Sequence, residues 1–262
     1  MNEPHVLYQV EKAIAVISFN RPEVKNAFSA EMIDLLHKFI IEARDDDSVK
    51  GIILTGKGDA FCAGGDVRAM AEGKLRAWDM KRFLWEGIHR VILLIEDLDK
   101  PLIAAINGDA TGAGMGLALM SDIRVCSDRA RFAESFIKLG LIAGDGDAYF
   151  LPRIVGMGKA LELLLTGDLI SAEQAFQLGI INRLVPQEQL MTEALAFMER
   201  IIRNPPLAVK MMKRAVYQAQ TNSLKNHLDY VSSQMALLAV TEDHLEAAQA
   251  FLEKRKPVFK GK

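Results

Sequence analysis

The chain has 262 residues, of which 50% are hydrophobic and 25% are charged, and its formal net charge is -2. This length and hydrophobic content suffice for a sizeable core in one large domain, or in a domain with an appendage. The charge balance lacks the basic excess of a nucleic-acid-binding domain, and the two cysteines, Cys62 and Cys126, are too few for a disulfide framework.

The N-terminal residues and the apolar stretches bear on localisation. The chain begins with Glu3 and Pro4 where a signal peptide carries basic charge. The uncharged stretches 101–108 and 110–121 are separated by Asp109 and interrupted by glycines, which argues against a transmembrane helix. We therefore expect a cytoplasmic protein that has neither a membrane nor a nucleic acid as its partner.

The first half of the chain alternates strand and helix patterns. Residues 6–19 predict two short strands that form a hairpin at Glu11-Lys12. Ser29 is the predicted N-cap of an amphipathic helix, and residues 49–55 predict a buried strand. The stretches "LIAAING" and "DIRVCS" repeat the strand pattern, so we expect a mixed α/β architecture built from crossover units.

Beyond Leu151 the pattern is mainly helical. Short helices are predicted over 158–167 and 171–179, and the second begins with the capping-box spacing of Ser171 and Gln174. A single strand, "IINRLVP", follows them.

The two consecutive prolines in residues 203–208 predict a hinge, because proline resists helix continuation and sheet pairing. From this hinge to Lys256 the pattern is almost wholly helical, and Thr241, followed by Glu242 and Asp243, is a predicted helix start. We therefore divide the chain into a core over residues 1–202 and a C-terminal helical region over residues 203–262.

Two glycine-bearing segments follow predicted strands, "AFCAGGDV" at 60–67 and "INGDATGAGMGLALMSD" at 106–122. Small residues let the backbone approach a ligand and point free N–H groups at it. If helices begin near Val67 and Ala113, each contributes N-terminal amides, and two amides aimed at one point form an oxyanion hole. The alternative is that these glycines only permit tight turns and close packing.

Several other site classes are disfavoured. Gly112, Gly114 and Gly116 have the spacing G-x-G-x-G, which is not the dinucleotide-binding fingerprint. The five histidines show no metal-ligand spacing with each other or with the cysteines, so we expect no metal site. Trp78 and Trp85, seven residues apart, are predicted to pack on one helix face.

The stretch "GLIAGDGDAYF" at 140–150 places Asp145 and Asp147 between glycines and apolar side chains. An ionised carboxylate is costly near apolar groups unless a partner or a reaction uses it. Two roles stay open for each aspartate. It is either an acid–base group whose pKa the apolar neighbours raise, or the N-cap of a helix that starts near Ala148.

Six segments in order resemble the enoyl-CoA hydratase/isomerase family, also called the crotonase superfamily. They are "ISFNRPEVKNAFS", "AFCAGGDV", "KPLIAAINGDATGAGMGLALMSDIRV", "FAESFIKLGLIAGDGDAYFLPRIVG", "LTGDLISAEQAFQLGIINRLVP" and "FLEKRKPVF". The resemblance implies a spiral of ββα units and a helical C-terminal region that forms a homotrimer or a dimer of trimers. It also implies an acyl-CoA thioester substrate, with no cofactor beyond the CoA of that substrate.

The resemblance further assigns roles by position. The N–H groups of Gly65 and Ala113 would hold the thioester oxygen. The implied CoA-binding residues are Lys25, Ala27, Ala63, Gly64, Asp66, Val67, Lys254 and Phe259.

The chain departs from the family's hydratase pattern at two positions. Hydratases carry glutamates where this sequence has Gly116 and Phe136, and an isomerase-like subgroup uses one aspartate at the position of Gly144. We therefore expect isomerisation or hydration of an enoyl-CoA, with a non-catalytic acyl-CoA-binding protein as the alternative. The candidate catalytic carboxyls are, in order of preference, Asp145, Asp147 and Glu134.

Overall fold

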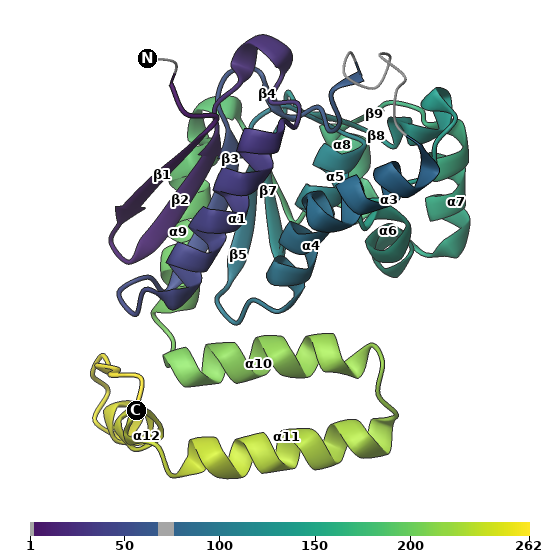
Figure 1. The fold of residues 1–262 in the computed structure, drawn as a ribbon. Helices are drawn as coiled ribbons and strands as arrows, with labels where there is room; N and C mark the ends of the chain where they lie inside the picture. Colours follow the sequence, from purple (N-terminus) through teal and green to yellow (C-terminus); the bar gives the residue numbers. More distant parts are fainter. Residues whose placement is uncertain (1–2, 68–75) are drawn as a thin grey trace. The chain divides into compact units, whose positions relative to one another are not determined.

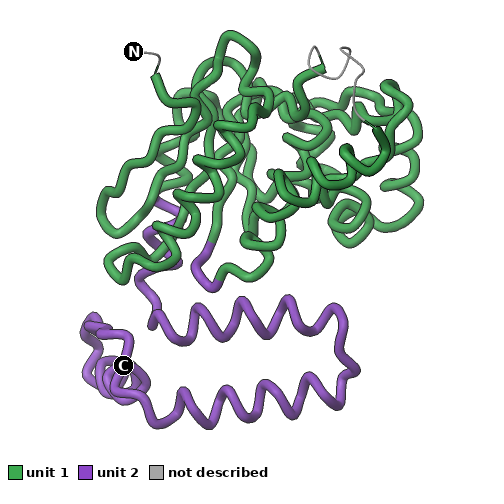
Figure 2. Tube along the Cα trace, in the orientation of Figure 1, with its two compact units in different colours: residues 1–98, 102–195 green, residues 99–101, 196–262 purple. Residues whose placement is uncertain are grey.

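A computed structural model describes residues 3–67 and 76–262, and the chain divides into two compact units (Figures 1 and 2). Unit 1 comprises Met1–Leu98 and Leu102–Leu195, and unit 2 comprises Asp99–Pro101 and Ala196–Lys262. The domain boundary at residues 202 and 203 stays a prediction.

Unit 1 contains a six-stranded sheet with the strand order β1-β2-β3-β5-β7-β10. The predicted hairpin is confirmed, because β1 and β2 pair antiparallel, and the other neighbours in this sheet pair in parallel. The strands are β1 (Val6–Glu11), β2 (Ile14–Phe19), β3 (Gly51–Gly56), β5 (Leu102–Ile106), β7 (Ile123–Ser127) and β10 (Arg183–Val185).

A second sheet has four strands in the order β4-β6-β8-β9. Its members are β4 (Ala60–Cys62), β6 (Asp109–Thr111), β8 (Arg131–Ala133) and β9 (Ile170–Ser171). The strands β4, β6 and β8 pair in parallel, and each closely follows a strand of the larger sheet in the sequence. Along the chain, a strand of the six-stranded sheet is therefore followed three times by a strand of the four-stranded sheet: β3 by β4, β5 by β6 and β7 by β8.

Helices separate the repeats and cover the sheets (Figure 1). The α-helices that begin in unit 1 are α1 (Ala30–Asp45), α3 (Ala77–Glu86), α4 (Ile88–Glu96), α5 (Ala113–Leu119), α6 (Asp147–Val155), α7 (Met157–Thr166), α8 (Ala172–Gln177) and α9 (Leu190–Ile202). The short 3-10 helices are η1 (Pro22–Val24), η2 (Ser135–Leu139) and η3 (Gln187–Gln189).

The predicted helix starts are confirmed where the structure describes them. The hydroxyl of Ser29 accepts from the N–H of Met32, and Ser171 and Gln174 form a complete capping box. The helix α5 begins at Ala113, as expected. The helix expected after Val67 falls on residues 68–75, which lie outside the described residues.

The predicted packing of Trp78 and Trp85 is wrong. Both lie on α3, but their exposed fractions are 70% and 61%. A spacing of seven residues puts two side chains on one helix face, but it does not decide whether that face meets the core. Here the face stays open, and the two rings help to line a cavity of about 370 Å³.

Unit 2 is helical, as predicted, with α10 (Pro206–Ala219), α11 (Leu224–Ala239) and α12 (Glu242–Leu252). The carboxylate of Asp99 pairs with Lys210 and Arg214 and so fastens the residues 99–101 to α10. The predicted helix start at Thr241 is confirmed, because its side chain accepts from the N–H of His244. None of the helices in the described residues is long and apolar enough to cross a membrane.

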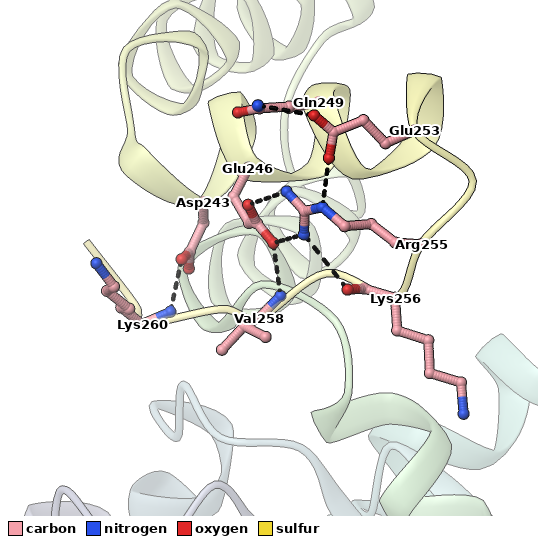
Figure 3. A network of polar contacts seen from close by, with 8 residues as sticks. All are labelled: Asp243, Glu246, Gln249, Glu253, Arg255, Lys256, Val258 and Lys260. Atoms are coloured by element: carbon pink, nitrogen blue, oxygen red, sulfur yellow. Dashed lines mark hydrogen bonds and ion pairs between the residues drawn. The ribbon is translucent and has the colours of Figure 1, made fainter.

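A polar network holds the C-terminal tail on α12 (Figure 3). The carboxylate of Asp243 accepts from the backbone N–H groups of Lys260 at 2.6 Å and Gly261 at 2.8 Å. Glu246 accepts from the N–H of Val258 at 2.9 Å and forms two hydrogen bonds with the Arg255 guanidinium. The Arg255 hydrogen bonds lower the pKa of Glu246 to about 2. The tail therefore follows a defined path from α12.

Asn26 fixes the turn that follows η1. This residue is fully buried with a φ of 56°, in the left-handed region that asparagine tolerates better than most residues. Its side chain accepts from the N–H of Arg21 at 2.8 Å, and it donates to the carbonyls of Lys57 at 3.0 Å and Ala60 at 2.8 Å. The turn is thereby joined to the loop between β3 and β4.

We expect Asn26→Ala to lower the free energy of unfolding by about 2–4 kcal/mol, measured by urea denaturation. The change removes the three hydrogen bonds of a buried side chain and puts alanine in a left-handed conformation. Asn222→Ala, at an exposed position in unit 2, is the control and is expected to be nearly neutral. An equal loss for the two variants would contradict the role of Asn26.

Candidate active site

The turn after η1 lies directly against the first glycine segment. The carbonyl of Lys25 accepts from the N–H of Ala63 at 2.9 Å, and the N–H of Phe28 donates to the carbonyl of Gly64 at 2.7 Å. Phe28 and Gly65 form a parallel bridge. The structure therefore brings together four residues to which a CoA-binding role was assigned by resemblance: Lys25, Ala27, Ala63 and Gly64.

The first glycine segment in turn contacts the second. The Thr111 hydroxyl donates to the carbonyl of Ala63 at 3.2 Å. A Cβ atom at Gly64 would lie 2.7 Å from the Thr111 carbonyl oxygen and 3.0 Å from the Ala113 nitrogen. A Cβ atom at Gly114 would lie 2.0 Å from the Cys62 carbonyl oxygen. Close packing of the two segments therefore requires glycine at both positions, as the packing interpretation of the sequence expected.

Within the part of the chain that the structure describes, each segment also presents a backbone N–H group without a protein acceptor. Ala113 is the first residue of α5, after the N-cap Gly112, and the first N–H groups of a helix have no partner within it. No hydrogen bond from the N–H of Gly65 or of Ala113 is found within residues 3–67 and 76–262. Two available donors therefore occur on segments that touch, and such donors are the components of an oxyanion hole.

The three candidate carboxyls are all buried. The exposed fractions are 1% for Glu134, 6% for Asp145 and 0% for Asp147. In the part of the chain that the structure describes, both oxygens of Glu134 and Asp147, and Oδ1 of Asp145, have no hydrogen-bond partner. Buried polar groups are normally hydrogen-bonded, and unpaired ones are found where a ligand or a reaction uses them.

Glu134 and Asp147 interact with one another. Burial raises the pKa of Glu134, and the negative charge of Asp147 nearby raises it further. Burial also raises the pKa of Asp147. Two neighbouring carboxyls in an apolar environment cannot both ionise readily, so at neutral pH the pair retains a proton that isolated carboxyls would lose.

Asp145 has a different environment. Burial raises its pKa, whereas His89 lowers it. The Nε2 atom of His89 lies 3.6 Å from Oδ1 of Asp145 and 3.0 Å from the carbonyl oxygen of Gly144. Burial is the larger effect, so the pKa of Asp145 is raised overall, and His89 offsets part of that rise.

The carboxylate of Asp147 lies against the bare backbone of α5 at Gly116. A Cβ atom at Gly116 would lie 2.6 Å from Oδ1, 2.7 Å from Oδ2 and 2.8 Å from Cγ of Asp147. Gly116 is three residues after Ala113, which corresponds to about 4.5 Å along a helix axis. The acid therefore lies about one helical turn from the N-terminal amide of α5.

The capping role considered for the aspartates is not observed. The N-cap of α6 is Gly146, with a φ of 97°, and no side chain caps this helix. Asp147 is the first residue of the helix and Asp145 precedes the cap. Glycine at 146 supplies the backbone conformation that the turn needs, and the two carboxyls point elsewhere.

Sequence reasoning missed His89, the second residue of α4. It lies 55 residues from Gly144 in the sequence, and no local pattern marks a histidine that contacts a distant loop. The only available signal was the presence of a histidine near the start of a mainly apolar helix.

The remaining candidate residues come from separate parts of the chain. Asp66 and Val67 are the last two residues of the first glycine segment, and Val67 is 50% exposed. Lys254 and Phe259 belong to unit 2. Lys25 pairs with Asp109 at 3.4 Å. In the described ranges, no group of three or more histidine, cysteine, aspartate or glutamate side chains is arranged to hold a metal ion.

Comparisons with known proteins agree on one family. Residues 9–262 match the family model described as enoyl-CoA hydratase/isomerase. The chain is 35% identical over 256 residues to crotonyl-CoA hydratase of Syntrophomonas wolfei, covering 97% of each chain. It is 35% identical over 258 residues to 1,2-epoxyphenylacetyl-CoA isomerase of Escherichia coli, covering 98% of each. The solved structure of an enoyl-CoA hydratase from Bacillus anthracis has a TM-score of 0.94 at 32% identity, covering 98% of this chain and 100% of that one.

The contact between Gly116 and Asp147 predicts an energetic coupling. We expect Gly116→Ala to destabilise the protein by about 1–3 kcal/mol, because the new methyl group overlaps the carboxylate. In an Asp147→Ala background the same change should cost much less. Thermal and urea unfolding of the four chains of this cycle measure the coupling.

Gly158→Ala is the matched control, because Gly158 lies in α7 and a Cβ atom there has no neighbour within 4 Å. This variant should gain a little stability from the higher helix propensity of alanine. The same loss for Gly116→Ala with and without Asp147 would show that the carboxylate is not the obstacle.

The raised pKa of Glu134 predicts a pH dependence of stability. A carboxyl with a higher pKa in the folded state binds more protons there than in the unfolded state, so stability falls as pH rises above the unfolded value. We expect the free energy of unfolding to fall less between about pH 5 and about pH 9 in Glu134→Gln than in the unmodified chain. Glu96→Gln, at an exposed position on α4, is the control. Parallel pH curves for Glu134→Gln and the unmodified chain would refute this expectation.

Proposed function

Because the chain belongs to the enoyl-CoA hydratase/isomerase family, we propose that it acts on an enoyl-CoA thioester through an enolate whose oxygen is stabilised by backbone amides. The reaction is double-bond isomerisation or hydration. One observation carries the proposal: two contacting glycine segments with available N–H groups lie about a helical turn from a buried cluster of carboxyls.

The N–H groups of Gly65 and Ala113 are the proposed oxyanion hole. Removal of a proton beside a thioester, or addition of water to a conjugated double bond, puts negative charge on the thioester oxygen. Preorganised donors aimed at that oxygen each lower the barrier by about 3–4 kcal/mol. The absence of a protein acceptor for either group within the described ranges supports this role.

Asp145 is the proposed base in isomerisation. It takes a proton from the α-carbon of a 3-enoyl-CoA, and the electrons of that C–H bond move into a dienolate whose charge rests on the thioester oxygen. The proton returns at the γ-carbon and gives the 2-enoyl-CoA, so no co-reactant is consumed. The burial of Asp145, together with His89 at 3.6 Å, which offsets part of the rise in its pKa, supports this assignment.

Hydration requires that one group accept a proton from water while another gives a proton to the α-carbon. The Glu134–Asp147 pair, which holds a proton beside the carboxylate of Asp145, supplies both kinds of group. The non-catalytic alternative depended on the absence of glutamates at positions 116 and 136. Three buried carboxyls at other positions, Glu134, Asp145 and Asp147, can do the work of those glutamates, so their absence no longer argues against catalysis.

We further propose which residues contact the CoA portion of the ligand and how the chains assemble. The turn at Lys25 and Ala27, with the segment Ala63–Val67, is the proposed contact for CoA, together with Lys254 and Phe259. No cofactor is needed beyond the CoA of the substrate, and a homotrimer or dimer of trimers in the cytoplasm is the proposed state. Large apolar side chains exposed on α11 and α12 support an oligomer: Leu224, Met235, Leu245 and Phe251.

We expect Asp145→Asn to lower kcat on an enoyl-CoA about 100- to 10,000-fold, because an amide cannot accept the proton. The dissociation constant for a CoA ester should change little, since the thioester and CoA contacts remain. Ultraviolet absorbance of the conjugated thioester measures turnover, and calorimetry measures binding.

Asp47→Asn, at an exposed site in unit 1, is the control and should keep full activity. Unchanged turnover in Asp145→Asn would remove this residue from the mechanism and direct the same test to Asp147 and Glu134. Absence of turnover in the unmodified chain, over a panel of 2-enoyl- and 3-enoyl-CoA thioesters, would refute the proposed function itself.

A further inference from the structure

His89 contacts this site although no family position assigned it a role, and its contacts are specific. Its Nε2 atom lies 3.0 Å from the carbonyl oxygen of Gly144. A carbonyl oxygen only accepts, so Nε2 carries the hydrogen in this contact. This hydrogen-bond donor is 3.6 Å from Oδ1 of Asp145, an oxygen that is buried and has no hydrogen-bond partner in the described chain.

The surroundings keep the imidazole in place. The side chain of His89 is 24% exposed, and that of Asp145 is 8% exposed, so water screens their interaction only weakly. The Trp85 ring meets the imidazole edge-on, with 5.9 Å between ring centroids and an angle of 83°. The rotamer of His89 is therefore limited by Trp85 on α3 and by the Gly144 carbonyl.

The loop that carries Asp145 needs such support. Gly144 and Gly146 flank the aspartate, and Gly146 has a φ of 97°. Among the described residues, a Cβ atom at Gly144 would meet only one atom within 4 Å, the Ile142 carbonyl oxygen at 3.8 Å. The backbone beside Asp145 is thus loosely packed at Gly144, and the hydrogen bond from His89 connects this loop to α4.

We propose that His89 is a positioning residue, whose Nε2–H binds the Gly144 carbonyl and faces Asp145, and thereby holds this carboxylate where it takes the substrate's proton. The inference rests on the proposed function, in which Asp145 is the base. His89 itself transfers no proton in this scheme.

The test compares three substitutions in the full chain. His89→Leu removes the donor, and its kcat on an enoyl-CoA should fall about 10- to 100-fold, with KM changed less than about threefold. His89→Gln keeps an N–H at nearly the position of Nε2 and should stay within about fivefold of the unmodified kcat. His89→Asn carries the same amide on a shorter side chain and should lose activity as the leucine variant does.

Controls separate a positioning role from a structural one. His37→Leu changes another half-buried histidine, on α1, and should leave kcat unchanged. Thermal midpoints of all variants show whether each chain folds. If the leucine variant does not fold, the comparison of glutamine with asparagine still tests the donor.

A double-mutant cycle with Asp145→Asn completes the experiment. If His89 acts through Asp145, His89→Leu should lower kcat little further in the Asp145→Asn background. Full activity of His89→Leu, equal losses in the folded glutamine and leucine variants, or additive losses in the cycle would each overturn the inference. If one of these outcomes is found and Asp145→Asn is inactive, the proposed function stays intact and only the role of His89 is refuted. If Asp145→Asn is active, the assignment of the base, on which the inference rests, is itself refuted.

Discussion

The contact between the Asp147 carboxylate and the bare backbone at Gly116 is the constraint on which the arrangement of the site depends. A helix residue without a side chain leaves room for a carboxylate delivered by α6, the helix that packs against α5. That carboxylate meets Glu134, which the chain supplies at the end of β8. Two acids from separate elements thus share one apolar environment close to the N-terminus of α5.

Burying three carboxyls opposes folding, since each loses hydration and the described chain gives most of their oxygens no hydrogen bond. The surrounding framework offsets this. Asn26 and Asn107 both donate to the carbonyl of Ala60, and the glycine segments pack backbone against backbone. Rigid supports of this kind hold groups in place that would otherwise relax toward water, and such tension between stability and chemistry is common at active sites.

Much of the fold was predictable because local signals agreed with the tertiary structure. The hairpin, the caps at Ser29 and Thr241 and the capping box at Ser171 each depend on a few neighbouring residues. The predicted ββα spiral is confirmed by the close match to solved structures of enoyl-CoA hydratases. Trp78 was misjudged because helical spacing gives a common face but not its environment.

The site was predictable only in part. An aspartate among glycines and apolar residues is unusual enough to be recognised in the sequence, and this pattern predicted Asp145 and Asp147 as site residues. The pairing of Asp147 with Glu134 and the contact of His89 with Gly144 join residues that are distant in the sequence. No single sequence encodes such pairs as a local pattern, so their discovery required the fold.

The attachment of the C-terminal tail has a consequence for how this part of the protein can diverge. Asp243 and Glu246 hold the tail through main-chain N–H groups, those of Lys260, Gly261 and Val258. These main-chain contacts do not depend on the side chain at Val258, whereas Lys260 also pairs with Glu242 and the φ of 77° at Gly261 favours glycine. Position 258 can therefore exchange its side chain over evolutionary time, to any residue that keeps a main-chain N–H, while the tail retains its path along α12.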